Sequence, residues 1–267
     1  MKRDVSAELQ LQIEVPTILE FQLAVASQPG VDLSETLSFV LNGDPVEPVE
    51  ILGAHGNRIH KLTAPPGSLT VEYAATVTGR ADPAPVTDSD LSMYLRPSRY
   101  AEADKFHGFA TREFGAGADS AALLRNVSSW VGTRLNYVPG SSDSIDGAVD
   151  TLLAGAGVCR DFAHLVVALL RAVAVPARVV SVYAPGLSPM DFHAVAEAFV
   201  AGRWRVVDAS LLAPRASMIR IATGRDAADT AFLTNHGGVV TLEKMHVTAV
   251  VDGDLPDDSI DRLVSLG

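Results

Sequence analysis

The sequence predicts an α+β fold in which an antiparallel β domain precedes a core of helices and strands. Three observations support this prediction. Short segments with alternating polar and apolar residues fill the first 80 residues, helical periodicity follows, and β-branched segments return after residue 175. The polar, proline-bearing segment 80–85 is the predicted boundary. It separates an N-terminal β-sandwich-like domain (1–84) from a core that includes the C-terminal strands (85–267).

Half-buried strands are expected throughout the first domain. Residues 6–15 alternate regularly between apolar and polar side chains, and a second strand is predicted over 17–27. Shorter strands, separated by turn sequences rich in Gly, Pro and Asn, are predicted over 37–41, 46–52, 58–62 and 69–77. Evenly spaced short strands are typical of an antiparallel sandwich.

Helices are predicted between the boundary and residue 171. A short helix is expected over 98–106, and two longer ones precede an apolar helix that begins at Cys159. Short polar residues that accept hydrogen bonds from backbone N–H groups are the candidate N-caps: Asp119 or Ser120 for the first of these, and Ser144 or Asp146 for the second.

Strands dominate again after the apolar helix. Residues 175–183 are β-branched, and the strands 192–200 and 203–208 are joined by the tight turn Ala201-Gly202. The remaining segments are predicted to be irregular over 211–223, ambiguous over 227–235, and one or two strands over 239–251.

Cys159, the only cysteine of the chain, lies where a loop with two glycines becomes a helix. The free backbone N–H groups and the dipole of a helix N-terminus favour a thiolate there. The same N–H groups are suited to hold the oxyanion of a carbonyl under attack. A lone cysteine in an apolar helix is usually a small buried hydrophobic residue, but the glycines and the adjacent Arg160-Asp161 pair favour a nucleophile.

A base and an orienting carboxylate are predicted on the hairpin. If Ala201-Gly202 forms a two-residue loop, Val195 lies opposite Asp208, and His193 is a diagonal neighbour of Asp208 on the same face. A register slip of one residue would separate them. Together with Cys159, they supply the nucleophile, base and orienting group that thiol catalysis needs.

Other candidates fit this chemistry less well. His164 lies five residues beyond Cys159, about 140° around the helix, and therefore faces away. Asp161 is interpreted as a helix-start residue that pairs locally with an arginine. Tyr137 and Tyr183 are candidate substrate contacts or oxyanion donors, and a core role for either remains open.

These blocks resemble the bacterial transglutaminase-like superfamily, over residues 120–215. The matching motifs are Gly155–Phe162, Val175–Arg178, Phe192–Ala194 and Trp204–Ala209. The resemblance implies a papain-like α+β core, the triad Cys159, His193 and Asp208, and acyl-enzyme chemistry on a glutamine-type or peptide amide. It also implies that the N-terminal β segment is the accessory domain found before this core in many bacterial members.

The predicted function is thiol-dependent hydrolysis or acyl transfer on a protein or peptide amide, through a thioester acyl-enzyme and without a cofactor or metal. Two alternatives remain open. One is acyl transfer from a thioester donor to an amine, and the other is a non-catalytic peptide-binding module with the same fold.

Composition limits the partners. The formal net charge of −11 argues against nucleic acid. No apolar segment has the length of a membrane span, no signal peptide is evident, and a single cysteine is compatible with a reducing compartment. The sequence therefore predicts a cytoplasmic protein that acts on a protein or peptide, and leaves the oligomeric state open.

Overall fold

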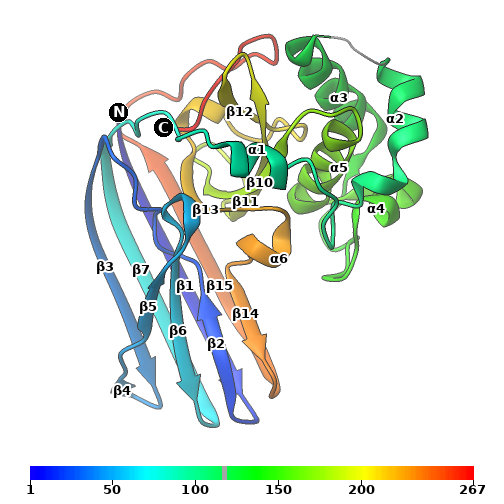
Figure 1. The fold of residues 1–267 in the computed structure, drawn as a ribbon. Helices are drawn as coiled ribbons and strands as arrows, with labels where there is room; N and C mark the ends of the chain where they lie inside the picture. Colours follow the sequence, from blue (N-terminus) through cyan, green and yellow to red (C-terminus); the bar gives the residue numbers. More distant parts are fainter. Residues whose placement is uncertain (116–118) are drawn as a thin grey trace.

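The structure, a computed structural model, describes residues 1–115 and 119–267. Two antiparallel sheets make the β domain, from the strands β1 Lys2–Ile13, β2 Thr17–Phe21, β3 Val31–Leu41, β4 Asp44–Pro45, β5 Val49–Leu52, β6 Arg58–Ala64, β7 Gly67–Gly79, β14 Leu233–His236 and β15 Val240–Val251. The sheet orders are β15-β1-β7-β3-β4 and β14-β2-β6-β5. The long strands extend away from the helical part of the molecule (Figure 1).

The alternating pattern of β1 explains the core of the β domain. Its apolar side chains, among them Leu9, Leu11 and Ile13, are fully buried, while the intervening polar residues stay partly exposed. They pack with buried residues of the other sheet, such as Leu19 and Phe21. A strand with one apolar and one polar face buries the apolar face against a second sheet. The predicted α+β class with an N-terminal β region is confirmed.

The last two strands join the sheets that the first segment builds. β15 pairs with β1 from Arg3↔Val251 to Ile13↔Val240, and β14 pairs with β2. Both are edge strands in the described part of the chain. The sequence pattern places these residues in the second domain, because pairing over more than 200 positions leaves no local signal. The boundary near residue 85 stays a prediction.

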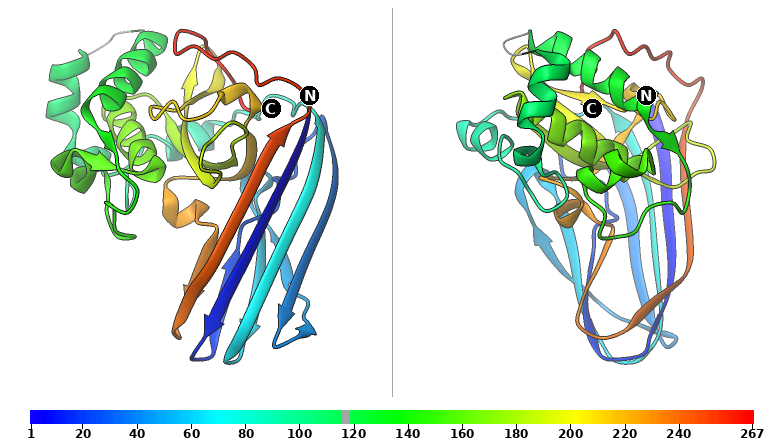
Figure 2. Two further views of the ribbon diagram at one scale, coloured as in Figure 1. Left: turned by 180° about the vertical axis from the view of Figure 1, so that it is seen from behind. Right: turned by 90° about the vertical axis from the view of Figure 1, so that its right-hand side faces the viewer.

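The second half of the molecule places helices against a third sheet, with the order β12-β11-β10-β13. The strands are β10 Ala177–Tyr183, β11 Phe192–Val200, β12 Arg203–Val207 and β13 Ile219–Gly224. The helices are α1 Asp88–Met93, α2 His107–Phe114, α3 Ser120–Arg134, α4 Ala148–Ala154, α5 Cys159–Ala172 and α6 Ala227–Thr230, with 3₁₀ turns η1 Ala54–Gly56, η2 Ala103–Lys105 and η3 Arg215–Ser217. Figure 2 shows the larger helices gathered beyond the ends of the long strands.

Helix α5 is the centre of this half. Its residues from Asp161 to Ala172 are all buried, and it packs on β11, on α3 and on α4. A helix with apolar residues on most of its surface is expected inside a domain, surrounded by other elements. None of the helices in the described residues combines the length and apolar content needed to span a membrane.

Some of the local predictions are corrected by the structure. The short helix expected over 98–106 is wrong, because backbone groups there bind distant segments: the Tyr100 N–H donates to Asp226, and the Tyr100 carbonyl accepts from Ala148. The segment 211–223, expected to be irregular, contains strand β13. Asp119 is confirmed as the N-cap of α3, whereas α4 begins after Gly147.

The third sheet packs directly against the β domain. Tyr183 of β10 and Ile221 of β13 belong to the apolar core of that domain. Asn57 donates to the Thr223 carbonyl and accepts from the Thr223 N–H, both at 2.8 Å. The β domain is therefore held firmly beside the sheet that carries the hairpin.

Candidate active site

Cys159 is the first residue of α5, and its neighbours explain its position. Gly155 ends α4 in the left-handed conformation (φ 64°), and a Cβ on Gly157 would lie 2.7 Å from the Asp161 Cβ. Asp161 is buried, accepts from the Val158 N–H at 2.7 Å and pairs with Arg160. A first-turn carboxylate that accepts from the N-cap backbone fixes the helix start, so the thiol is held at the helix N-terminus; the predicted local pairing of Asp161 is confirmed.

The hairpin has the predicted register. Val200 pairs with Arg203 and Ala196 with Val207, across a turn in which Ala201 has a φ of 51° and Gly202 a φ of 74°. Two positive φ values are typical of a type I′ turn, whose twist suits a two-residue hairpin. This register brings Asp208, which follows β12, within reach of β11.

His193 and Asp208 form a buried pair. The Asp208 Oδ2 lies 2.8 Å from the His193 Nε2, and both side chains are almost completely buried. Burial alone would lower the pKa of His193, but the charge and hydrogen bond of Asp208, together with the adjacent Cys159 thiol, raise that pKa to about 10. Burial opposes ionisation of Asp208, but the imidazolium outweighs it and lowers the Asp208 pKa. Nδ1 of His193 has no hydrogen-bond partner in the described chain, and it is the nitrogen left for the thiol.

Ser210 is a site residue that the sequence analysis missed. Its backbone N–H and its hydroxyl donate to the Asp208 Oδ1, at 2.9 and 2.6 Å. The second carboxylate oxygen of Asp208 is therefore fixed as firmly as the first. An aspartate that accepts from the backbone two residues later is a common turn motif, so the Asp-Ala-Ser sequence carried a signal for this contact.

The two candidate tyrosines occupy different environments. Tyr137 pairs with Gly157 in a short parallel bridge between β8 Asn136–Tyr137 and β9 Ala156–Gly157, and its hydroxyl lies beside the Cys159 thiol and backbone N–H. Burial, with the thiol, raises the pKa of Tyr137 to about 12. Tyr183 is fully buried and donates to the Leu23 carbonyl at 2.8 Å. The interpretation of Tyr183 as a substrate contact is therefore corrected: it is a core residue that joins the two halves of the molecule.

A cavity of about 680 Å³ contains Cys159 and His193. The third sheet contributes one wall, with Ser181 and Phe192. Further lining residues come from α6, from the segment that leads into β14, and from Met245 of β15. The candidate site is thus a cleft between the two halves of the molecule, and the β domain supplies part of it.

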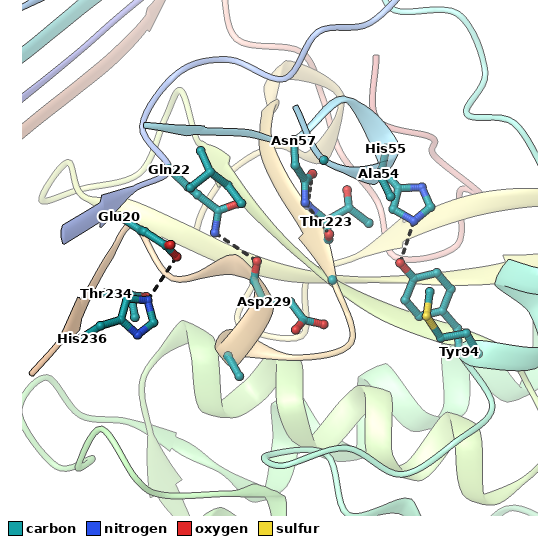
Figure 3. Close-up of a pocket in the computed structure, with 15 residues that line it drawn as sticks. Glu20, Gln22, Ala54, His55, Asn57, Tyr94, Thr223, Asp229, Thr234 and His236 are labelled. Atoms are coloured by element: carbon teal, nitrogen blue, oxygen red, sulfur yellow. Dashed lines mark hydrogen bonds and ion pairs between the residues drawn. The ribbon is translucent and has the colours of Figure 1, made fainter. Parts of the chain in front are cut away.

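A second cavity, of about 400 Å³, lies at the same junction but contains neither Cys159 nor His193. Figure 3 shows the Tyr94 hydroxyl beside His55, at 2.8 Å, and Glu20 beside His236, at 3.2 Å. Gln22 lines both cavities. Within the described residues, no group of three or more His, Cys, Asp or Glu side chains is arranged to hold a metal ion.

Comparisons with known proteins agree with this architecture. Residues 109–209, which contain Cys159, His193 and Asp208, match the model of the transglutaminase-like superfamily. A crystal structure of a proposed cysteine protease from Cytophaga hutchinsonii is 32% identical, with a TM-score of 0.89, and the match covers 98% of this chain and 96% of that one. The chain belongs to the transglutaminase-like superfamily.

Two uncharacterized mycobacterial proteins are also similar. The one from Mycobacterium leprae is 26% identical over 148 residues, which are 51% of this chain and 52% of that protein. The one from Mycobacterium tuberculosis is 33% identical over 122 residues, which are 45% of this chain and 38% of that protein. The chain therefore spans about half, or less, of the length of these curated relatives.

Proposed function

We propose that this protein hydrolyses or transfers the acyl group of a protein or peptide amide through a thioester on Cys159. The observation that carries this proposal is the His193 imidazole, held at 2.8 Å by Asp208 while its other nitrogen is left for the thiol. A raised His193 pKa favours an imidazolium beside a thiolate, the reactive state of thiol enzymes. The Cytophaga hutchinsonii relative, a proposed cysteine protease, supports the same class of reaction.

The proposed reaction has two balanced steps. In the first, the Cys159 thiolate attacks the amide carbonyl, His193 gives its proton to the leaving amine or ammonia, and a thioester remains on sulfur. In the second, neutral His193 takes a proton from water or an amine, which attacks the thioester and releases the thiolate. The product is a carboxylic acid with water, or a new amide with an amine.

The neighbouring groups have supporting roles in this proposal. Asp208, fixed by Ser210, orients the imidazole and stabilises its charged form. The Cys159 backbone N–H and the Tyr137 hydroxyl lie beside the thiol, and we assign them to the oxyanion of the tetrahedral intermediate. No cofactor has a part in these steps, and the cytoplasmic location stays a prediction.

The test is the rate at which iodoacetamide alkylates Cys159 as a function of pH, for the wild-type protein and for His193→Ala. We expect alkylation of the wild-type protein to stay fast at pH values at which a free cysteine, with its pKa of ~8.5, is protonated and slow to react, and we expect this fast reaction to be lost in the variant. A slow thiol that titrates like free cysteine in both proteins would contradict the proposal and favour a non-catalytic peptide-binding module.

Turnover is measured with a glutamine-containing peptide and hydroxylamine as the amine. Ammonia release without hydroxamate indicates hydrolysis, and hydroxamate formation indicates acyl transfer. Cys159→Ser is the matched control, because it keeps the shape of the side chain and removes the thiol.

A further inference from the structure

Strand β14 borders the cleft with an unpaired edge. It pairs with β2 on one side, and in the described part of the chain no strand pairs with its other side. Three consecutive β14 residues, Leu233, Thr234 and Asn235, line the cavity that contains Cys159 and His193. An unpaired sheet edge is a template for another extended chain, and here the edge strand and a candidate nucleophile line the same cavity.

The register of β14 with β2 shows which backbone groups of β14 point toward its unpaired edge. The Gln22 N–H donates to the Phe232 carbonyl at 3.0 Å, and β14 continues this register with Leu233↔Phe21 and Asn235↔Leu19. Hydrogen-bonded and non-hydrogen-bonded pairs alternate in an antiparallel ladder. The N–H and C=O groups of Leu233 and Asn235 therefore point away from β2, toward the open edge.

Several apolar side chains lie beside this edge. Phe192 of β11 stacks on Phe232, with ring centroids 4.9 Å apart, and both line the cleft with Leu233. Met245 of β15, 37% exposed, extends the same surface. A chain that pairs with β14 would place a side chain against this apolar surface.

We propose that the substrate is an extended, unpaired peptide segment that adds as a further strand to the edge of β14, with a bulky apolar side chain against Phe192, Phe232 and Met245. This inference rests on the proposed function, because it takes Cys159 as the nucleophile. The unpaired donors and acceptors of Leu233 and Asn235 match a peptide backbone and its spacing. A folded segment, whose backbone groups are already paired, offers no such partner, so the substrate class is a chain terminus or a disordered tail.

The test uses thiol-directed peptides, so that no natural substrate is needed. One probe is acetyl-Ala-Leu-Ala chloromethyl ketone, and the other is iodoacetyl-Ala-Leu-Ala amide, which presents the peptide in the opposite direction. Labelling of Cys159 is followed by mass spectrometry, and each rate is divided by that of the same reactive group without a peptide. We expect a ratio of at least about 10 for one of the two probes, equivalent to the gain from a few backbone hydrogen bonds.

The matched variants are Asn235→Pro and Asn235→Ala. Proline removes the outward N–H without touching a bond to β2, and alanine keeps that N–H. We expect the ratio to fall about five- to tenfold in Asn235→Pro and to stay within twofold in Asn235→Ala. Equal ratios in the two variants, or no peptide enhancement with either probe, would overturn the inference.

Wild-type protein gives an independent readout if Asn235→Pro does not fold. N-methylation of single amides in the more effective probe should lower the ratio at alternate residues only, because alternate N–H groups of an added strand face β14. A uniform effect along the probe would overturn the strand pairing. Failure of the proposed function is distinct, since it appears in the iodoacetamide profile of wild type and His193→Ala without any peptide.

Discussion

Two buried ionic clusters share strand β11, only four residues apart. At one, His193 meets Asp208 beside the cleft. At the other, Glu197 meets Arg178 of β10 and Arg220 of β13, with N···O distances of 2.7 Å to each. All five side chains are at least 97% buried, and ionisation of both acids is strongly favoured by their partners.

The clusters differ in what they leave unused. Both oxygens of Glu197 accept hydrogen bonds, and the groups left there without a hydrogen-bond partner among the described residues are buried guanidinium N–H groups of Arg178 and Arg220. The Arg178 guanidinium lies over the Trp204 ring, 3.9 Å from its centroid. His193 keeps one nitrogen free, next to the thiol, and lines an open cleft. Burial and a shifted pKa are therefore common to a structural and a candidate catalytic cluster. The free reactive atom in an accessible cavity distinguishes the second.

The largest expected effect is on turnover. Cys159→Ala should lower the rate about 10⁴-fold or more, because the nucleophile is lost. The melting temperature should change little, since the thiol is partly exposed and forms no disulfide. The peptide–hydroxylamine assay and a thermal melt measure the two quantities. Retained turnover would show that the cleft cluster is as structural as the other one.

Glu197→Gln should show the opposite behaviour. Two arginines would stay buried without a counter-charge, which destabilises a protein by about 3–5 kcal/mol. Alkylation of Cys159 in the fraction that remains folded should be unchanged. Urea unfolding gives the stability, and the triple replacement of Arg178, Glu197 and Arg220 by methionine is the control, because it removes the unpaired charges. A triple variant less stable than the single one would contradict this explanation.

Asp208→Asn should alter the pH profile as well as the rate. With Asp208 present, His193 keeps its proton until the pH approaches about 10, so proton donation to the leaving group fails only above that value. Without the carboxylate, burial lowers the His193 pKa and the alkaline limb moves to lower pH. We expect about a 10²-fold loss of rate at neutral pH. If the alkaline limb of the pH–rate profile lies at the same pH in Asp208→Asn and in the wild-type protein, Asp208 is not the orienting group.

His164 provides a pH effect without catalysis. It is fully buried on α5 and its Nε2 accepts from the Ala227 N–H at 3.1 Å. Burial lowers its pKa from 6.5 to about 3. Between these two values His164 is protonated in the unfolded chain and neutral in the folded chain. Protonation of His164 in the unfolded chain therefore lowers the free energy of unfolding as the pH falls below 6.5, by roughly 2 kcal/mol at pH 5. Urea titrations above pH 6.5 and at pH 5 measure the free energy of unfolding. We expect it to decrease less between the two conditions in His164→Gln, the control, than in the wild-type protein.

Ser210→Ala should have the smallest effect. It removes one hydrogen bond to Asp208 and leaves the backbone one. A single hydrogen bond is worth about 1 kcal/mol, so we expect a rate decrease of about fivefold, with a small decrease in the pKa of His193. An alteration as large as that of Asp208→Asn would mean that Ser210 has a chemical role of its own.

The sequence by itself determined the elements whose signals are local. The alternation of β1, the start of α5 at Cys159 and the Ala201-Gly202 turn were all predictable, because each depends on neighbouring residues only. The turn also fixed a register, and the register brought His193 to Asp208. The juxtaposition of that pair was therefore predictable across 15 positions.

Only the tertiary structure decided how distant segments complete the cleft. β14 and β15 pair with the first strands of the chain, and α6 lies against the helix that carries the thiol. Tyr137 and Tyr183 looked alike in the sequence, yet one lies beside Cys159 and the other closes a core. Such outcomes depend on burial and backbone pairing between segments far apart in the chain, and these leave no periodic trace in either segment alone.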